Sequence, residues 1–324
     1  MVLTARRLVG TVSLLTFAGA AIAAPFSVRD QNPLLAGFGL PRAMPSRVAA
    51  NDDWQLAADF TWGNSAIVKA NARESLIVDA ETRELRLTIG RGIGERFALQ
   101  LQLPYRYTGG GDLDGFIDDW HGWFGFSDGP RNQLPQDEYR IAYRSDGVTA
   151  MDLRSPASGL GDISADVGYQ IATSTSADIA AWFSLKLPTG DADKLTGSGA
   201  MDASLILAAE RRFANRWSVF GQVGVSYLGE GDLLADQQES IVWSGMAGIG
   251  VNVWRGLGLK LQFDAHSAAF DETDMGFLGE AVTLSVGGSY RFNTGWVLDA
   301  GVSEDVMVDA SPDVVFVLGL HHAL

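Results

Sequence analysis

The chain has 324 residues, 38 of them glycine and none cysteine, and its 39 acidic residues outweigh 24 basic ones, giving a formal charge of −15. This charge disfavours nucleic acid as a partner, because the phosphates would be repelled. Without cysteine the chain has no disulfide framework, thiolate zinc site or cysteine nucleophile, so its own hydrogen bonds must close the fold.

Residues 1–23 have the pattern of a secretory signal. Arg6 and Arg7 form a basic start, an apolar run follows, and Ala21-Ile22-Ala23 is a cleavage site of the A-x-A type. We expect the mature chain to begin at Ala24, with 22 basic against 39 acidic residues and a charge of −17.

Residues 24–52 are predicted to form an extended segment. It contains Pro33, Pro41 and Pro45, which disfavour a regular helix or strand. Its composition is compatible with a periplasmic tail or with a plug that folds inward.

From residue 53 onward, apolar and polar residues alternate in segments long enough to cross a bilayer as tilted strands, and no later run of 18 apolar residues could cross it as a helix. Short turns and long connections alternate between these segments, as in barrels with short periplasmic turns. The sequence therefore predicts an all-β fold, a single antiparallel transmembrane β-barrel of about 12 strands over residues 53–324, with both termini in the periplasm. The predicted strands are 53–63, 74–91, 96–108, 159–172, 177–188, 200–213, 216–228, 240–254, 257–268, 280–292, 296–304 and 313–324.

The alternation assigns apolar side chains to lipid and polar side chains to the lumen. A soluble β-sandwich would reverse this assignment, but aromatic residues such as Trp217, Trp243 and Tyr290 near strand ends favour interfacial girdles. Twelve strands fall between filled eight-stranded barrels and open pores, so the lumen could be a narrow passage or a salt-bridged core. The candidate lumen-lining residues are Arg86, Gln100, Gln102, Arg106, Asp162, Asp166, Lys186, Asp202, Glu210, Arg212, Lys260, Gln262, Asp264, His266, Arg291 and Asp299.

The longest connection, 109–158, contains a predicted short helix over 112–125, because its apolar residues recur at helical spacing. This helix could plug the barrel mouth, lie on the membrane surface, or pack on the outer rim. Its acidic face is poorly suited to an anionic surface, so we expect a plug or cap. The residues assigned to it are Phe116, Asp118, Asp119, Trp120, His121, Trp123 and Phe124.

The block from Gly115 to Phe126, followed by Gly129-Pro130-Arg131, resembles the most distinctive part of the domain of unknown function 3187 family, as do Arg29 to Leu34 and Gly159-Leu160-Gly161-Asp162. The resemblance covers most of the mature chain. It implies an outer-membrane barrel of a Gram-negative bacterium, and it implies no known reaction or ligand.

Two glycine-containing motifs flank neighbouring strands. Gly159-Leu160-Gly161-Asp162 and Leu187-Pro188-Thr189-Gly190-Asp191 are similar to motifs of barrels linked to degradation of aromatic compounds, which suggests uptake of small hydrophobic molecules. The structural interpretation is stronger, because glycine permits bulges at strand ends and Pro-Thr-Gly-Asp is an efficient turn.

Acidic residues gather in the predicted outer loops, including Glu230, Asp232, Asp271 and Glu272. They could bind divalent cations that bridge to lipopolysaccharide, but no calcium-loop pattern is present, and a solvated acidic rim is the simpler account. We expect no resident metal and no cofactor.

Catalysis is not expected. The four histidines are His121, His266, His321 and His322, and the sequence has no Gly-x-Ser-x-Gly elbow, His-Glu-x-x-His site or phosphate loop.

The last strand ends at Leu324 and resembles the C-terminal signal by which barrel-assembly machinery recognises its substrates. We therefore expect a monomeric, integral outer-membrane protein in contact with outer-membrane lipids and lipopolysaccharide. Its predicted role is a narrow or plugged, porin-like channel for passive passage of a small solute, which could be hydrophobic. The alternative is a non-conducting barrel that has a structural role or binds cations or lipopolysaccharide.

Overall fold

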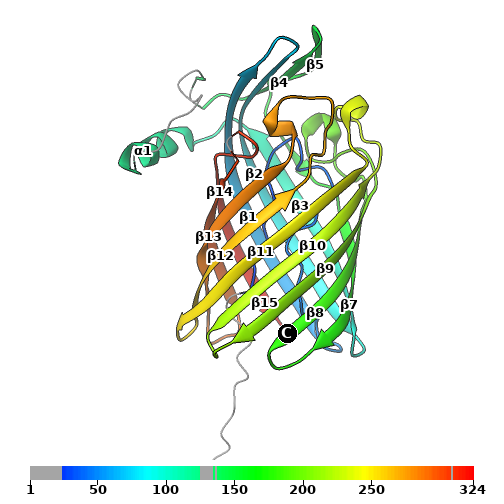
Figure 1. The fold of residues 1–324 in the computed structure, drawn as a ribbon, viewed down its shortest axis with the longest axis vertical. Helices are drawn as coiled ribbons and strands as arrows, with labels where there is room; N and C mark the ends of the chain where they lie inside the picture. Colours follow the sequence, from blue (N-terminus) through cyan, green and yellow to red (C-terminus); the bar gives the residue numbers. More distant parts are fainter. Residues whose placement is uncertain (1–23, 125–133, 136, 308) are drawn as a thin grey trace, which may run out of the picture.

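The computed structural model describes residues 24–124, 134–135, 137–307 and 309–324, so the predicted signal lies outside the described residues. Twelve of the described strands close into an antiparallel barrel, which confirms the predicted fold class (Figure 1). Closure comes from pairing of the first strand with the last, from Gln55 opposite Ala323 to Asn64 opposite Val314. The barrel strands are β1 (Trp54–Ala70), β2 (Glu74–Ile93), β3 (Phe97–Gly109), β7 (Ser164–Thr173), β8 (Ala177–Lys186), β9 (Asp202–Phe213), β10 (Trp217–Leu228), β11 (Ile241–Trp254), β12 (Leu257–His266), β13 (Ala281–Arg291), β14 (Val297–Asp305) and β15 (Val314–Ala323).

The two ends of the barrel differ. Tight turns join strands at the end where Trp54 and Leu324 lie, here called the turn end. Ala214 and Asn215 form one such turn with φ of 49° and 54°, the left-handed pair that matches the twist of a two-residue hairpin. The longer connections lie at the opposite end, here called the loop end. They carry the short 3-10 helices η2 (Ala192–Lys194), η3 (Ala235–Gln237) and η4 (Gly276–Leu278).

One predicted loop is wrong. Residues 64–73 were expected to connect two strands, but β1 continues to Ala70 and β2 begins at Glu74, so only a tight turn remains. Gly63-Asn64-Ser65 has the composition of a turn, yet Asn64 pairs with Val314 on one side and Glu81 on the other.

Three strands were not predicted. β4 (Arg140–Ser145) pairs with the upper part of β2, and β5 (Val148–Leu153) pairs with β4, so this sheet rises beyond the barrel at the loop end (Figure 1). β6 (Ala157–Leu160) pairs with β3. β4 and β5 lie within 109–158, where the apolar spacing predicts only a short helix, whereas β6 ends inside the predicted strand 159–172.

Burial is the reverse of that in a soluble protein. On β2, the outward Leu85 and Leu87 are 43% and 45% exposed, whereas the inward Glu84 and Arg86 are 2% and 6% exposed. The aromatic residues Trp217, Trp243 and Tyr290 are exposed near strand ends. This distribution suits a barrel with lipid around it and polar groups within.

The helix in the long connection, α1 (Asp114–Phe124), packs outside the barrel (Figure 1). Leu113 and Ile117 form an apolar cluster with Val314, and the Phe116 and Phe316 rings meet edge to face at 5.9 Å. Val314 and Phe316 are on the outward face of β15, so the expected plug or cap position of residues 112–125 is wrong. We based the predicted plug or cap position on the acidic residues of the helix, but its apolar residues pack on the outer rim of the barrel. The side chains of Asp118, Trp120, His121 and Phe124 lie outside the described part.

Within the described ranges, no helix is long and apolar enough to cross a membrane.

Candidate functional site: the filled lumen

The extended segment before β1 occupies the barrel interior, where dark blue chain is visible behind the strands in Figure 1. It begins near the turn end, where the Lys260 side chain donates to the Ala24 carbonyl. It reaches the loop end at Asn32, whose amide donates to the Phe277 carbonyl. It then returns to the turn end, where Asn51 forms a bridge with Gly92. Residues 24–51, here called the luminal segment, therefore run up and down the lumen.

Three glutamine side chains of the barrel wall form hydrogen bonds with the backbone of this segment. Gln262 of β12 accepts from the Phe26 N–H at 2.8 Å and donates to the Phe26 carbonyl at 3.2 Å. Gln222 accepts from the Met44 N–H at 2.7 Å, and Gln170 accepts from the Val48 N–H at 2.9 Å. Each amide supplies both a donor and an acceptor, so it pairs with an extended backbone as a neighbouring strand would. Their second bonds go to the carbonyls of Arg42 and Ser46.

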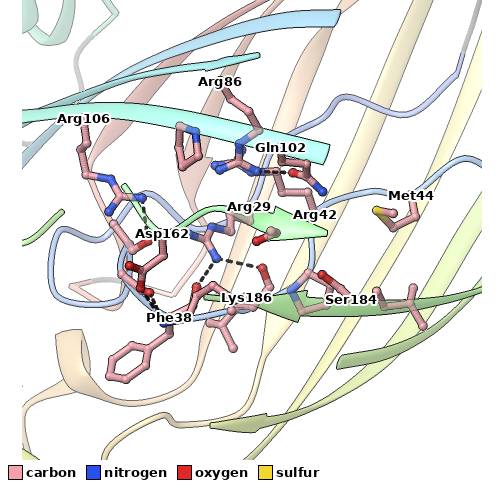
Figure 2. Close-up of a pocket in the computed structure, with 18 residues that line it drawn as sticks. Arg29, Phe38, Arg42, Met44, Arg86, Gln102, Arg106, Asp162, Ser184 and Lys186 are labelled. Atoms are coloured by element: carbon pink, nitrogen blue, oxygen red, sulfur yellow. Dashed lines mark hydrogen bonds and ion pairs between the residues drawn. The ribbon is translucent and has the colours of Figure 1, made fainter. Parts of the chain in front are cut away.

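One carboxylate joins the luminal segment to the wall at mid-height. Glu84 of β2 is only 2% exposed and lies 2.6 Å from guanidinium nitrogens of Arg42, Arg86 and Arg106. These three arginines are labelled in Figure 2. Arg42 comes from the luminal segment, and the other two come from β2 and β3. A buried charge requires such partners, because removing it from water costs several kcal/mol.

Nearby, Arg29 holds the turn of the luminal segment together. Its guanidinium donates to the carbonyl oxygens of Ala36, Phe38 and Leu40 at 2.6–2.8 Å. Arg106 donates to the same Ala36 carbonyl at 2.7 Å. The guanidinium groups thus satisfy buried carbonyls that a non-repetitive backbone would otherwise leave unpaired.

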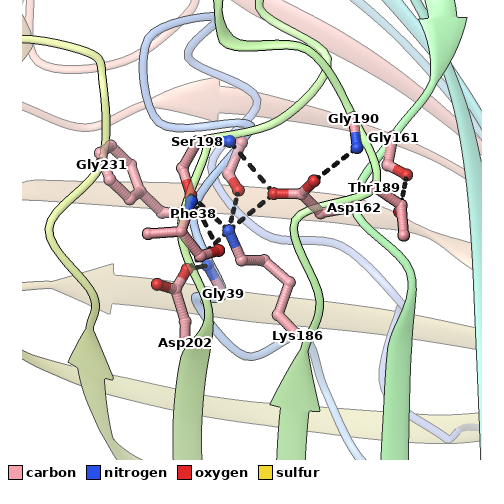
Figure 3. A network of polar contacts seen from close by, with 12 residues as sticks. Phe38, Gly39, Gly161, Asp162, Lys186, Thr189, Gly190, Ser198, Asp202 and Gly231 are labelled. Carbon is pink, nitrogen blue, oxygen red and sulfur yellow. Dashed lines mark hydrogen bonds and ion pairs between the residues drawn. The ribbon is translucent and has the colours of Figure 1, made fainter.

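A second ion cluster lies where the luminal segment turns at the loop end. The Lys186 ammonium is 2.6 Å from Asp162, 3.0 Å from Asp202 and 3.0 Å from the Gly37 carbonyl (Figure 3). Asp202 also accepts from the Gly39 N–H at 2.7 Å. The cluster therefore fixes the turn to β8, β9 and the chain before β7.

The two glycine-containing motifs build this cluster. Asp162 accepts from the Gly190 N–H at 2.8 Å, and Thr189 donates to the Gly161 carbonyl at 2.9 Å. A Cβ on Gly37 would lie 2.6 Å from the Gly197 backbone, so only glycine allows this close approach. The motifs act here in positioning the luminal segment, consistent with their structural interpretation.

The loop between β8 and β9 is braced by an exposed ion pair. Lys194 donates to Asp191 at 2.6 Å, and this hydrogen bond holds the pKa of the Asp191 carboxyl below its usual range. Asp191 also accepts from the Asp193 N–H at the start of η2.

The loop end of the lumen is closed by apolar side chains. Leu34, Leu35 and Phe38 of the luminal segment pack with residues from the long connections and from β4. The Phe38 and Phe270 rings meet edge to face at 5.6 Å. The other members of this apolar lid include Ile67, Leu76, Val78, Ile141, Tyr143, Met275, Phe277 and Leu278.

The turn end contains a cavity of about 460 Å³ between the two arms of the luminal segment and the wall. We call it the turn-end cavity. The luminal segment contributes Ala24, Pro25, Ser27 and residues 42–45 to it. The wall contributes Gln55, Ala57, Asp59, Thr88, Gln100, Gln102, Arg291, Val297, Asp299, His321 and His322, among others.

The residues predicted to line the lumen form separate groups, and all but Asp162, which lies between β6 and β7, are on strands. Arg106 is in the Glu84 cluster, whereas Asp162, Lys186 and Asp202 form the loop-end cluster. Among the remaining predicted residues, the hydrogen-bonded pairs are Arg86 with Gln102, Gln102 with Asp166, and Gln262 with Asp264. The ion pairs are Glu210 with Arg212, Lys260 with Asp299, and His266 with Asp30. Gln100 and Arg291 line the turn-end cavity.

The sequence prediction missed Glu84, Gln170 and Gln222. All three occupy inward positions of predicted strands, so the two-residue period could have found them. The candidate set favoured charged residues, and the contacts of the two glutamines become visible only once residues 24–51 are placed in the lumen.

The described histidines are structural in their contacts. His266 is 3.0 Å from Asp30, and His321 is 3.0 Å from Asp59. The His322 and Trp296 ring centroids are 4.6 Å apart, with the ring planes tilted by 48°. In the part of the chain that the structure describes, no group of three or more histidine and acidic side chains is arranged to hold a metal ion.

These features define a transmembrane barrel whose lumen is filled by its own N-terminal segment. The chain belongs to the family described as Protein of unknown function (DUF3187), whose model matches residues 9–324. This confirms the resemblance found in the sequence. Among curated proteins, none matches the chain.

Similar solved structures include an outer membrane channel from Pseudomonas putida F1, with a TM-score of 0.58 and 13% identity over 87% of this chain and 99% of that chain. The CymD monoaromatic hydrocarbon channel has a TM-score of 0.40 and 12% identity over 93% of this chain and 94% of its own. The Pseudomonas putida toluene transporter TodX has a TM-score of 0.40 and 10% identity over 94% and 99%. The first similarity shows the fold, and the other two are too distant to carry an argument.

Proposed function

We propose that this protein is an outer-membrane channel for passive passage of a small solute, and that the luminal segment is its plug. The observation that carries this proposal is that residues 24–51 occupy a twelve-stranded lumen, where side-chain amides and ion pairs join them to the wall alongside apolar contacts. The interior of an eight-stranded barrel is filled by side chains alone, and a twelve-stranded barrel is wider. Withdrawal of the segment would therefore leave an open, polar passage.

The character of the wall supports a channel over a permanent core. Inward groups such as Glu84, Lys186 and Asp202 are charged, and water could solvate them once the segment left. In a barrel that never opened, apolar packing would be expected to stabilise the interior more than buried ion pairs do.

The proposal includes an orientation. The turn end faces the periplasm, with both chain ends there, and the loop end faces outward. Because the chain has no cysteine, single cysteines can test this in intact cells with a membrane-impermeant maleimide. Gly147→Cys in the β4–β5 hairpin should react, and Gly94→Cys at the turn end should react only after the outer membrane is opened. The reverse pattern would contradict the orientation.

Planar-bilayer conductance tests the channel itself. Wild type should give small or infrequent steps, and deletion of residues 24–50 should give larger ones. Deletion of residues 112–124 is the matched control, because α1 packs outside the barrel. If the plug deletion folds as a heat-modifiable barrel and remains silent, the channel proposal fails.

The apolar lid favours a second candidate, a non-conducting barrel with a structural or lipopolysaccharide-binding role. In that case the acidic loop residues would bind divalent cations bridging to lipopolysaccharide. Neutralising Glu230, Asp232, Asp271 and Glu272 together should then alter the sensitivity of cells to chelators. Unchanged sensitivity would remove the cation role. Under either candidate we expect a monomeric, non-enzymatic barrel inserted by the assembly machinery.

A further inference from the structure

The turn-end cavity has the size of a small-molecule site. Its volume of about 460 Å³ falls within the range of about 300–1,000 Å³ typical of ligand pockets. The short side chain of Ala57 lies on the β1 wall of the cavity, and Ala43 lies on the facing arm of the luminal segment. The space is thus bounded by secondary structure on one side and by the plug on the other.

The charged groups around the cavity are already paired. Asp59 is 3.0 Å from His321, Asp299 is 3.0 Å from Lys260, and Arg42 is 2.6 Å from Glu84. Arg291 is likewise engaged. A charged ligand would lose its hydration, and the cavity groups that could neutralise its charge already have partners. The cavity therefore favours a neutral molecule.

Amide groups line one wall. Gln55 and Gln100 are joined by a single long contact of 3.4 Å, although Gln100 is only 9% exposed. Each amide can make four hydrogen bonds, so donors and acceptors remain for a ligand. Thr88 adds a hydroxyl on the intervening strand.

The luminal segment forms a second, mostly apolar wall. Met44, Pro25 and Pro45 line it, and Val297 of β14 adds an aliphatic side chain. A thioether packs well against an aromatic ring. The described lining contains no Phe, Tyr or Trp on which a sugar ring could stack. This pair of walls suits a flat ring with polar groups along one edge.

We propose that the turn-end cavity binds a neutral aromatic molecule that carries hydroxyl or carbonyl groups. The ring packs on Met44 and the two prolines, and the polar edge bonds with Gln55, Gln100 and Thr88. The idea that this molecule is the transported solute rests on the proposed function, but its binding does not require transport.

Isothermal titration of the refolded full-length protein in detergent tests the proposal, with 4-hydroxybenzyl alcohol as the probe and empty micelles as the blank. Saturable binding is expected for this alcohol. The charged 4-hydroxybenzoate and the non-aromatic sucrose should bind at least about tenfold more weakly. If 4-hydroxybenzoate bound as tightly as the alcohol, the ligand would not need to be neutral. If sucrose bound more tightly, the ligand would not be aromatic.

Variants locate the site. Ala57→Leu, which fills the cavity, should weaken binding at least tenfold, whereas Ala300→Leu on the exposed outer face of β14 should leave it unchanged. Gln100→Ala should weaken it about fivefold, the loss expected for one hydrogen bond of about 1 kcal/mol. Binding that is absent in wild type, or unaffected in both cavity variants, overturns the proposal. A protein that conducts without binding the probe would leave the channel proposal standing.

Discussion

The side-chain amide of Gln262 pairs with both backbone polar groups of Phe26, at 2.8 Å and 3.2 Å. Phe26 comes from the luminal segment and Gln262 from the barrel wall, 236 residues later in the chain. The wall therefore holds the luminal segment as a strand holds its neighbour, but through side chains that substitution can remove one at a time.

Removing two of these amides should loosen the plug without unfolding the barrel. In Gln222→Ala/Gln262→Ala, each lost amide leaves buried backbone groups unpaired, at a cost of about 1–3 kcal/mol. Hydrogen exchange of residues 24–50 should accelerate, and channel opening should become more frequent. Gln55→Ala is the luminal control, since its contact is with Gln100. Unchanged exchange in the double variant would show that these bonds do not retain the plug.

A disulfide should lock the plug in place. A Cβ on Gly63 of β1 would lie 3.6 Å from the Gln31 Cβ, within the range of disulfide bonds. Gln31→Cys/Gly63→Cys should therefore hold conductance at its lowest level when oxidised and return it to the wild-type level after reduction. Each single-cysteine variant controls for the substitutions alone. Full conductance with the disulfide formed would mean that the plug need not move.

Replacing Lys186 should destabilise the barrel. Lys186→Met keeps much of the side-chain volume but leaves Asp162 and Asp202 buried without their cation. The expected cost is about 3–5 kcal/mol, as for other broken buried ion pairs. The urea midpoint of the folded, heat-modifiable band measures it. Lys194→Met removes an exposed pair and should shift the midpoint little.

Deletion of residues 24–50 should also make the channel select cations. The deletion removes Arg29, Arg42 and Arg47, while the inward acidic residues of the wall outnumber its basic ones. The reversal potential in a potassium chloride gradient measures this preference. Anion selectivity would mean that the exposed Arg86 and Arg106 dominate the passage.

The outer helix should be dispensable for closure. Ile117→Asp places a charge in the apolar contact with Val314 and should release α1 from the rim. Conductance should stay at the wild-type level, while protease cleavage near residue 117 increases. A rise in conductance would assign α1 a part in gating despite its outer position.

The two-residue period predicted the barrel well because polar side chains are concentrated on inward strand positions and large apolar side chains on outward ones. Leu85 and Arg86 are neighbours in the chain with opposite environments, and alternation alone separates them. The period cannot report what fills the lumen, because the luminal segment has no regular repeat. Asp30 and His266 meet across 236 positions, and only the folded barrel brings them together. The acidic pattern of α1 misled for a related reason, since Leu113 and Ile117 pack on a surface that local sequence does not define.

The luminal segment starts and finishes at the turn end, with Ala24 close to Lys260 and Asn51 close to Gly92. The segment therefore enters as a hairpin, and no chain end has to be threaded along the barrel axis for it to leave or return. The seam between β1 and β15 joins the two extremes of the barrel sequence, so the wall can close only once β15 is in place. The hairpin can then be captured by the closing seam or inserted afterwards, and either order gives the same unknotted topology.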